Sequence, residues 1–388
     1  MKAIVNTKLV LENGIVFDGV LLIEDGVIVK LGPKDKIEIP EGAEVIDAKG
    51  LYTAPGFVDI HCHGTQHDLF NINPAACADF YARHGTTTVL PTFYHSLNLE
   101  EMLEGAARIK EAAKSGTGRI MNGLYMEAPY MSSTGSNFKY ILWKGDILPE
   151  EYIPLLEGIS DYVRIWAIDP CRPGIEGFMK DVKAYNPDAI FAMGHSRAYS
   201  RDCYKLRKYG LKVRTHITDG GKAKGSAQGC IGAGCDEYTL IEPDVYAEII
   251  VDENGIHVHP DTVRMIIRAK GVEHVILITD GMKADGDFKN DAEAGIEFGP
   301  DLNYDYEGKL AGSHLTMDGA VRNVMKHTGY GLCHAIRFAT LNPARLLGLD
   351  NEIGSLEEGK KANLVLIDDV VNVKKVFYEG ELLCDNEA

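Results

Sequence analysis

The two ends of the chain share a pattern of short apolar runs broken by turns. Near the N-terminus these runs fall at 9–11, 14–17, 20–23 and 27–29, and Asp18-Gly19 and Asp25-Gly26 lie between them. Asp-Gly pairs are strong hairpin signals, so both pairs predict tight turns. Runs at 363–368 and 376–380 have the same character. Because a pair of strands is marginal alone, we expect residues 1–53 and 346–388 to form one small β-sandwich together.

A different pattern fills the middle of the chain, where longer apolar runs alternate with stretches of helical spacing. The apolar runs lie at 52–61, 86–92, 120–127, 163–169, 189–195, 213–216, 246–251 and 275–280, and the helical stretches include 73–83, 99–113, 260–270 and 318–326. Alternating strands and helices predict an α/β fold, here a (β/α)8 TIM-like barrel over residues 54–345. A doubly wound open sheet has the same periodicity and is the alternative.

Charge narrows the class of partner. The formal net charge is −17, from 40 basic and 57 acidic residues. An acidic chain repels nucleic acid and anionic membrane surfaces, so we expect a small-molecule substrate. The first residues lack a signal-peptide pattern, and we find no apolar run of about 18 residues, so the prediction is a cytoplasmic protein.

The eight cysteines include no Cys-x-x-Cys pair. We therefore expect the cysteines, Cys62 included, to be reduced and to pack as small residues in the core.

Residues able to bind a metal end several of the predicted strands. They are His61, His63, Glu127, His195, His216 and Asp280. Barrel enzymes build their active sites at the carboxyl ends of their strands, from several strands at once. Six such residues at those ends favour the barrel over the open sheet and predict that they meet in one site.

The residue types at these ends are suited to metal-assisted hydrolysis. His61 and His63 are two apart on a strand, so they project to one side and could bind one cation together. Imidazole suits zinc and similar first-row metals, and Glu127 could complete one site or bridge two. Water on such a metal has a pKa of roughly 7, which supplies hydroxide to attack a carbonyl. Asp280 would take the proton from that water and return it to the leaving nitrogen.

Each of these residues has an ordinary structural explanation when taken alone. Histidines are common on half-buried strands, and a carboxylate after a strand often caps the next helix. Their combination indicates a metal-dependent hydrolase, against the alternative of a binding protein that kept the fold and lost the chemistry. His257 alternates with His259 after the seventh predicted strand, where a substrate contact is expected.

Short motifs occur along the chain: APGFVDIHCHG at 54–64, GTTTVLPT at 85–92, EAP at 127–129, GHS at 194–196, TH at 215–216, TDGM at 279–282, LAGSHLTMD at 310–318, NPAR at 342–345 and GSLEEGKKANL at 354–364. They resemble the motifs of the amidohydrolase superfamily and, within it, of the N-acetylglucosamine-6-phosphate deacetylases. They run through nearly the whole chain.

The resemblance implies a barrel with a small β-sandwich and hydrolysis of the acetamide of an amino sugar. It implies that Glu127, His195 and His216 are the core metal ligands, that His61 and His63 add a second metal position, and that Asp280 is the acid/base. One or two zinc ions, or another first-row metal, are the implied cofactors. The implied substrate contacts are His257, Asp219, Gly220, Leu310, Ala311 and Gly312, and the implied assembly is a homodimer.

The sequence departs from this family where phosphate is expected to bind. The segment SSTGSNFK at 132–139 lacks the histidine that the family usually has, and ITDGGKAKG at 217–225 lacks its arginine. Ala128 also stands where glycine is usual. Lys222 and Lys224 could supply charge to a phosphate instead. The metal and acid/base residues are thus present, while another N-acyl or cyclic amide without phosphate stays open as the substrate.

Overall fold

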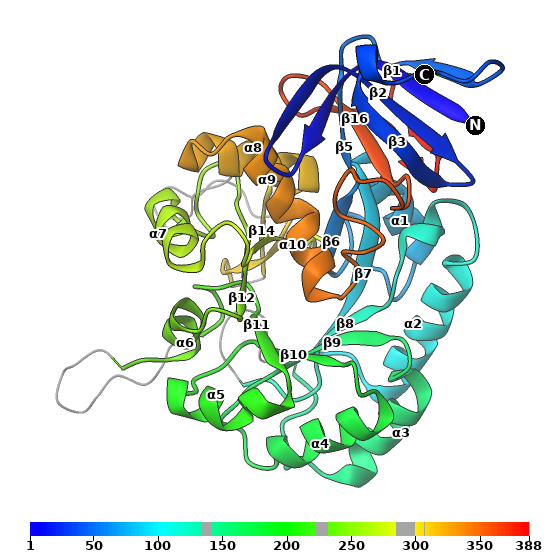
Figure 1. The fold of residues 1–388 in the computed structure, drawn as a ribbon. Coiled ribbons are helices and arrows are strands. Elements are labelled where there is room, and N and C mark those ends of the chain that lie inside the picture. The colour runs from blue at the N-terminus through cyan, green and yellow to red at the C-terminus, as the bar shows by residue number, and fades with distance from the viewer. Residues whose placement is uncertain (133–140, 222–231, 285–298, 306, 388) are drawn as a thin grey trace.

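A computed structural model describes residues 1–132, 141–221, 232–284, 299–305 and 307–387. Two large sheets organise these residues, and Figure 1 shows them as a barrel with a smaller β unit packed on one side. Both termini lie in the smaller unit (Figure 1). Within the described residues, no helix has both the length and the apolar character needed to cross a membrane.

Eight parallel strands form the barrel, and each pairs with the next in chain order. They are β6 (Phe57–Cys62), β7 (Thr86–Tyr94), β8 (Leu124–Glu127), β9 (Val163–Ile168), β10 (Ile190–Met193), β11 (Leu211–Arg214), β12 (Tyr246–Ile249) and β13 (Val275–Leu277). Just beyond β13, the Asp280 N–H donates to the His61 carbonyl at 2.9 Å, and the His63 N–H donates to the Gly281 carbonyl at 2.7 Å. The first and last strands therefore meet, which confirms the barrel and excludes the open sheet.

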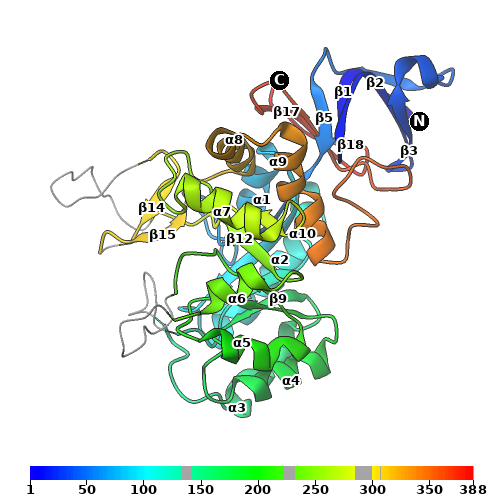
Figure 2. The same ribbon diagram turned by 60° about the vertical axis from the view of Figure 1, so that its left-hand side comes forward.

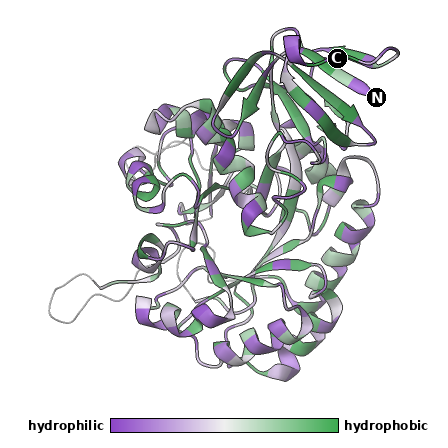
Figure 3. Cartoon of the chain, viewed as in Figure 1, coloured by the Kyte–Doolittle hydropathy of each residue, from purple (hydrophilic) through white to green (hydrophobic). Residues whose placement is uncertain are grey.

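Helices surround the strands, as the turned view in Figure 2 shows. They are α1 (Pro74–Arg83), α2 (Leu99–Ala112), α3 (Pro149–Ile159), α4 (Ile175–Tyr185), α5 (Ser200–Leu206), α6 (Cys235–Ile241), α7 (Pro260–Lys270), α8 (Met317–Thr328), α9 (Leu332–Ala339) and α10 (Leu341–Leu346). Asn98 and Glu101 form a capping box that starts α2, and Pro260 occupies the first turn of α7, where its missing N–H costs nothing. Figure 3 shows apolar strands inside and mixed helices outside.

The second sheet is built from both ends of the chain. Its strands are β1 (Lys2–Leu11), β2 (Gly14–Glu24), β3 (Val27–Pro33), β4 (Glu44–Asp47), β5 (Tyr52–Pro55), β16 (Leu364–Ile367), β17 (Val373–Tyr378) and β18 (Glu381–Asp385). β5 joins the two halves, because it pairs with β1 on one side and β16 on the other. Its residue Ala54 and Val365 of β16 belong to the same buried cluster as the barrel core. The predicted small β unit from both termini is therefore confirmed.

Two local predictions were wrong. Asp18-Gly19 is not a hairpin: β2 continues through it with Asp18 at φ 48°, and the β1–β2 register shifts nearby. A bulge absorbs the irregular residue without ending the strand. Asp25-Gly26, by contrast, does join β2 to β3.

The predicted run 52–61 also proved to be two strands. Residues 52–55 form β5 of the small sheet, and the barrel strand β6 starts at Phe57. A Cβ on Gly56 would lie 2.2 Å from the Thr87 Oγ1 atom, so glycine permits the chain to cross closely between the two sheets. β5 runs across the boundary predicted between residues 53 and 54, and the domain limits at 53/54 and 345/346 stay a prediction.

A two-stranded hairpin lies against the end of the barrel. It consists of β14 (Leu302–Tyr304) and β15 (Leu310–Ser313). The Ser313 N–H donates to the Asp280 carbonyl at 2.8 Å, and the Met282 N–H donates to the Ser313 carbonyl at 2.9 Å. This pairing places β15 beside the segment that follows β13.

Candidate active site

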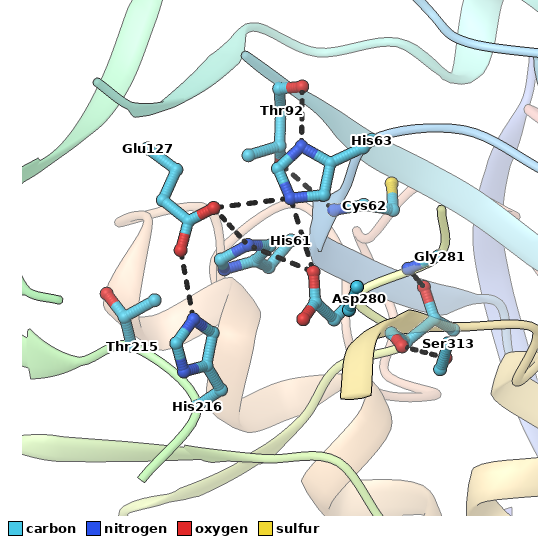
Figure 4. Close-up of polar contacts among 12 residues, drawn as sticks. His61, Cys62, His63, Thr92, Glu127, Thr215, His216, Asp280, Gly281 and Ser313 are labelled. Atoms are coloured by element: carbon cyan, nitrogen blue, oxygen red, sulfur yellow. Dashed lines mark hydrogen bonds and ion pairs between the residues drawn. The ribbon is translucent and has the colours of Figure 1, made fainter. Parts of the chain in front are cut away.

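The carboxyl end of the barrel brings the six predicted residues together. His61 is in β6 and His63 follows it directly, and their rings lie 5.4 Å apart between centroids. Both rings reach the same two carboxylates, Glu127 and Asp280, as Figure 4 shows. Cys62, between the histidines, is buried, and its Sγ lies 3.8 Å from the Leu90 carbonyl oxygen.

The Glu127 carboxylate stands at the centre of the site, with histidines on each of its two oxygens. Its Oε1 is 2.9 Å from Nε2 of His195 and 2.9 Å from Nε2 of His216. Its Oε2 is 3.3 Å from Nε2 of His63 and 3.9 Å from Nε2 of His61. One carboxylate therefore separates two pairs of imidazoles.

Asp280 lies on the side of the first pair. Its Oδ1 is 3.2 Å from Nε2 of His63 and 3.5 Å from Nε2 of His61 (Figure 4). The backbone of Asp280 is held by His61 and Ser313 in the contacts that close the barrel. These backbone contacts hold Asp280 beside the two histidines.

Three of these residues adopt a backbone conformation that is unusual for any residue but glycine. The φ angles are 39° at His195, 27° at His216 and 48° at Asp280. Such conformations cost on the order of 1–3 kcal/mol each and persist where the surroundings enforce them. All three follow barrel strands, and from there their side chains reach the cluster around Glu127 and His63.

Burial and close charges shift the pKa values of three residues of the site in opposite directions. Burial opposes ionisation of Glu127, but His195, His216 and His63 outweigh it and hold the Glu127 pKa well below its usual value. Burial likewise opposes protonation of His63, yet hydrogen bonds and charges from Asp280 and Glu127 raise its pKa to about 10. The His216 pKa rises to about 9 against burial, through Glu127. A cation could replace these protons.

The donor set fits a divalent first-row metal. Three overlapping groups have ligand atoms within 4.8 Å of one another: His61, His63 and Glu127; His61, His216 and Asp280; and Glu127, His195 and His216. Nε2 of His61 is buried and has no hydrogen-bond partner among the described residues. An unpaired buried nitrogen is costly unless a ligand meets it. Imidazole and carboxylate donors together suit zinc and its neighbours.

The residues predicted to contact substrate lie around this centre. Oδ2 of Asp219 lies 3.7 Å from Nδ1 of His257, and their opposite charges act against burial to lower the Asp219 pKa and raise that of His257. Gly220 has φ 63°, and a Cβ there would lie 2.7 Å from Nδ1 of His195, so glycine is needed for this close approach.

The predicted loop at Leu310, Ala311 and Gly312 is strand β15. A Cβ on Gly312 would lie 2.7 Å from the carbonyl oxygen of Asp280. This strand therefore borders Asp280, the predicted acid/base residue. Lys222 and Lys224, and residues 133–139 of the other altered segment, lie outside the described residues.

Charged residues inside the barrel strands were missed by the sequence reasoning. Asp59, Arg214 and Glu248 are almost wholly buried. The Arg214 guanidinium donates to the Asp219 carbonyl at 2.9 Å and to the Met193 carbonyl at 3.0 Å, so it holds the segment that follows His216. Their signal was a charged residue within an otherwise apolar run, which is rare unless the charge is paired.

Comparison with known proteins identifies the family. The model of the amidohydrolase family matches residues 52–383. The chain belongs to this family. It is 30% identical to an N-acetylgalactosamine-6-phosphate deacetylase of Escherichia coli O157:H7, over 97% of each chain, and 27% identical to an N-acetylglucosamine-6-phosphate deacetylase of Haemophilus influenzae, over 94% of each. The crystal structure of N-acetylglucosamine-6-phosphate deacetylase from Pasteurella multocida superimposes with a TM-score of 0.84 at 25% identity, covering 99% of this chain and 100% of that one.

These matches confirm the resemblance that the motifs carry. The protein is a metal-dependent hydrolase of the amidohydrolase family.

Proposed function

We propose that this protein removes the acetyl group from an N-acetylated amino-sugar 6-phosphate, N-acetylglucosamine 6-phosphate or a related sugar. Relatives named for the glucosamine and the galactosamine sugars support this substrate class. One observation carries the chemical part of the proposal. Glu127 lies between two histidine pairs, and the Asp280 carboxylate is 3.2 Å from one of these histidines, His63.

His195, His216 and Glu127 would hold one divalent ion, and His61, His63 and Glu127 a second, with zinc the first candidate. A bound ion lowers the pKa of water and polarises the acyl carbonyl. Asp280 takes one proton from the attacking water and delivers it to the sugar nitrogen as the C–N bond breaks. The products are acetate and the free amine, so the atoms balance with one water consumed.

The remaining residues would bind and orient the sugar. His257 and Asp219 offer a donor and an acceptor at hydrogen-bonding positions beside the site. β15 would cover the substrate with the backbone of Leu310, Ala311 and Gly312. Specificity then depends on polar groups placed on a rigid frame, since a site that hydrogen-bonds a hydroxyl rejects analogues lacking it.

The substrate proposal is tested by acetate release from four compounds. These are the N-acetylglucosamine and N-acetylgalactosamine 6-phosphates and the two unphosphorylated sugars. We expect kcat/KM at least about 100-fold higher with phosphate, since charge-assisted hydrogen bonds contribute about 1.5–3 kcal/mol each. Equal rates with and without phosphate would contradict the proposal.

A second candidate is hydrolysis of another N-acyl or cyclic amide that carries no phosphate. The observation that favours it is the absence of arginine from 217–225 and of histidine from 132–139. A panel of N-acetyl amino acids and cyclic amides, assayed in parallel with the sugars, decides between the two.

A further inference from the structure

Glu248 is a buried carboxylate that contacts both halves of the metal-binding cluster. It lies in β12, with its side chain fully buried. Its Oε2 is 3.2 Å from Nδ1 of His61, and the backbone N–H of His216 donates to the same oxygen at 3.3 Å. Within the part of the chain that the structure describes, His61 is its only ion-pair partner.

The chemistry of histidine makes this contact important. A neutral imidazole carries its proton on one nitrogen, and the hydrogen bond made at one nitrogen determines which of the two is free to bind a metal. At His61, Glu248 meets Nδ1, while Nε2 faces Glu127 and Asp280 with no hydrogen-bond partner among the described residues. The proton therefore belongs on Nδ1 and the lone pair on Nε2.

His63 shows the same arrangement with a different acceptor. Its Nδ1 is 3.2 Å from the backbone carbonyl of Thr92, and its Nε2 faces the same two carboxylates. A backbone carbonyl adds no net charge, whereas the Glu248 carboxylate does. Burying that charge costs several kcal/mol unless a cation or strong donors compensate it. On the far side of the His61 ring, Nε2 stands 3.9 Å from Glu127 and 3.5 Å from Asp280, where an ion between these groups would offset the charge of Glu248 through the ring.

We propose that Glu248 is a positioning residue that fixes His61 with its proton on Nδ1 and so builds the ion position formed by His61, His63 and Glu127. This inference rests on the proposed two-ion site. The competing explanation is that Glu248 only satisfies the His216 N–H and fills the barrel. The two explanations differ in what happens to metal affinity when the carboxylate is replaced.

The test is a titration of the ion-free protein with zinc in the presence of a competing chelator. The variants are Glu248→Met, which keeps the volume and removes the acceptor, and Glu248→Gln, which keeps one acceptor oxygen. Asp318→Asn is the matched control, because Asp318 is a buried carboxylate whose partners are His84 and Arg322. Thermal unfolding of each variant reports whether the fold is kept.

We expect the parent and Asp318→Asn to bind two equivalents. Glu248→Met should keep the first with its parent affinity and bind the second about 10- to 100-fold more weakly, the usual effect of losing such a partner. Glu248→Gln should show a smaller loss, because its amide oxygen can still accept the Nδ1 proton. If Glu248→Met does not fold, Glu248→Gln decides alone.

Two equivalents with unchanged affinities in both variants would overturn the role of Glu248 and leave the two-ion proposal intact. An equal loss at both positions would also overturn it, since that is the result of a general structural defect. A parent that binds a single equivalent would contradict the two-ion proposal itself, and this inference with it.

Discussion

The two histidine pairs around Glu127 are built in different ways. His61 lies in β6 and His63 directly after it, and they approach Oε2 of the carboxylate at 3.9 and 3.3 Å. His195 and His216 follow two different strands, both with positive φ, and approach Oε1 at 2.9 Å each. The first pair is a local pattern of the sequence, while the second exists only when β10 and β11 lie side by side.

This difference has a consequence for how each half of the site is held. Alternation along a strand is sufficient to aim His61 and His63 the same way. His195 and His216 need strained backbone, which the buried Arg214 supports by tying the ends of β10 and β11 together. Asp280 lies next to the first pair, because its carboxylate is within 3.5 Å of both His61 and His63.

Among the substitutions, the largest expected effect comes from removing the proton acceptor on the side of the first pair. Asp280→Asn should lower kcat by roughly 100-fold or more, the usual value of acid–base catalysis. Metal content should stay at the parent level, because each histidine pair still has Glu127. Acetate-release kinetics and metal analysis on the same preparation measure the two quantities. Near-parent turnover would remove Asp280 from the mechanism.

Substitution within each pair tests whether the halves are separate ion positions. His61→Gln and His195→Gln should each weaken one of two zinc equivalents by at least about tenfold, and leave the other near its parent affinity. The physical reason is that each pair uses its own oxygen of Glu127. Isothermal titration of the ion-free proteins gives both affinities. Loss of both equivalents in either variant would mean that the cluster behaves as one unit.

Lowering the pH should release the metal without any substitution. The pKa values of His63 and His216 are raised to about 10 and about 9 in the ion-free chain. An ion must therefore displace their protons, so zinc affinity should rise with pH up to that range and fall as pH is lowered. The change is up to about tenfold per pH unit for each proton released. Zinc titrations at pH 6, 7 and 8 measure it, and a pH-independent affinity would contradict the proposed ligands.

Much of the fold could be predicted because the spacing of apolar residues in a helix or a strand repeats over a few neighbouring positions. The helix at 260–270 was placed to the residue as α7, and 99–113 matches α2 (Leu99–Ala112) within one residue. The prediction of a single strand over 52–61 failed, because this segment forms two strands, β5 and β6, in different sheets. Apolar residues continue through Gly56 from one sheet to the other, so the sequence carries no turn signal between them. The prediction of a hairpin turn at Asp18-Gly19 failed because β-bulges and hairpin turns favour the same residue types.

The residues of the site also divide into those that the sequence predicts and those that it does not. Residues at strand ends were predictable, since a barrel gathers them at one edge whatever the distances within it. The contacts of Glu248, within β12, and of Arg214, the last residue of β11, were not predictable, because no sequence pattern shows which partners a buried charge in a barrel will have. Their partners come from other strands, so only the closed structure shows what compensates them.

The hydrogen bond from the Asp280 N–H to the His61 carbonyl closes the barrel between its first and last strands. The proposed acid/base and a proposed ligand thus meet at the seam of the fold, so the site cannot form in a chain that has folded only part of the way. Contacts between such distant segments form late, because loop closure must come first. An ion that binds the folded site and not the unfolded chain adds its binding energy to the stability of the folded state. Turnover would in this way depend on the closed barrel, because Asp280 stands beside His61 and His63 only when the first and last strands meet.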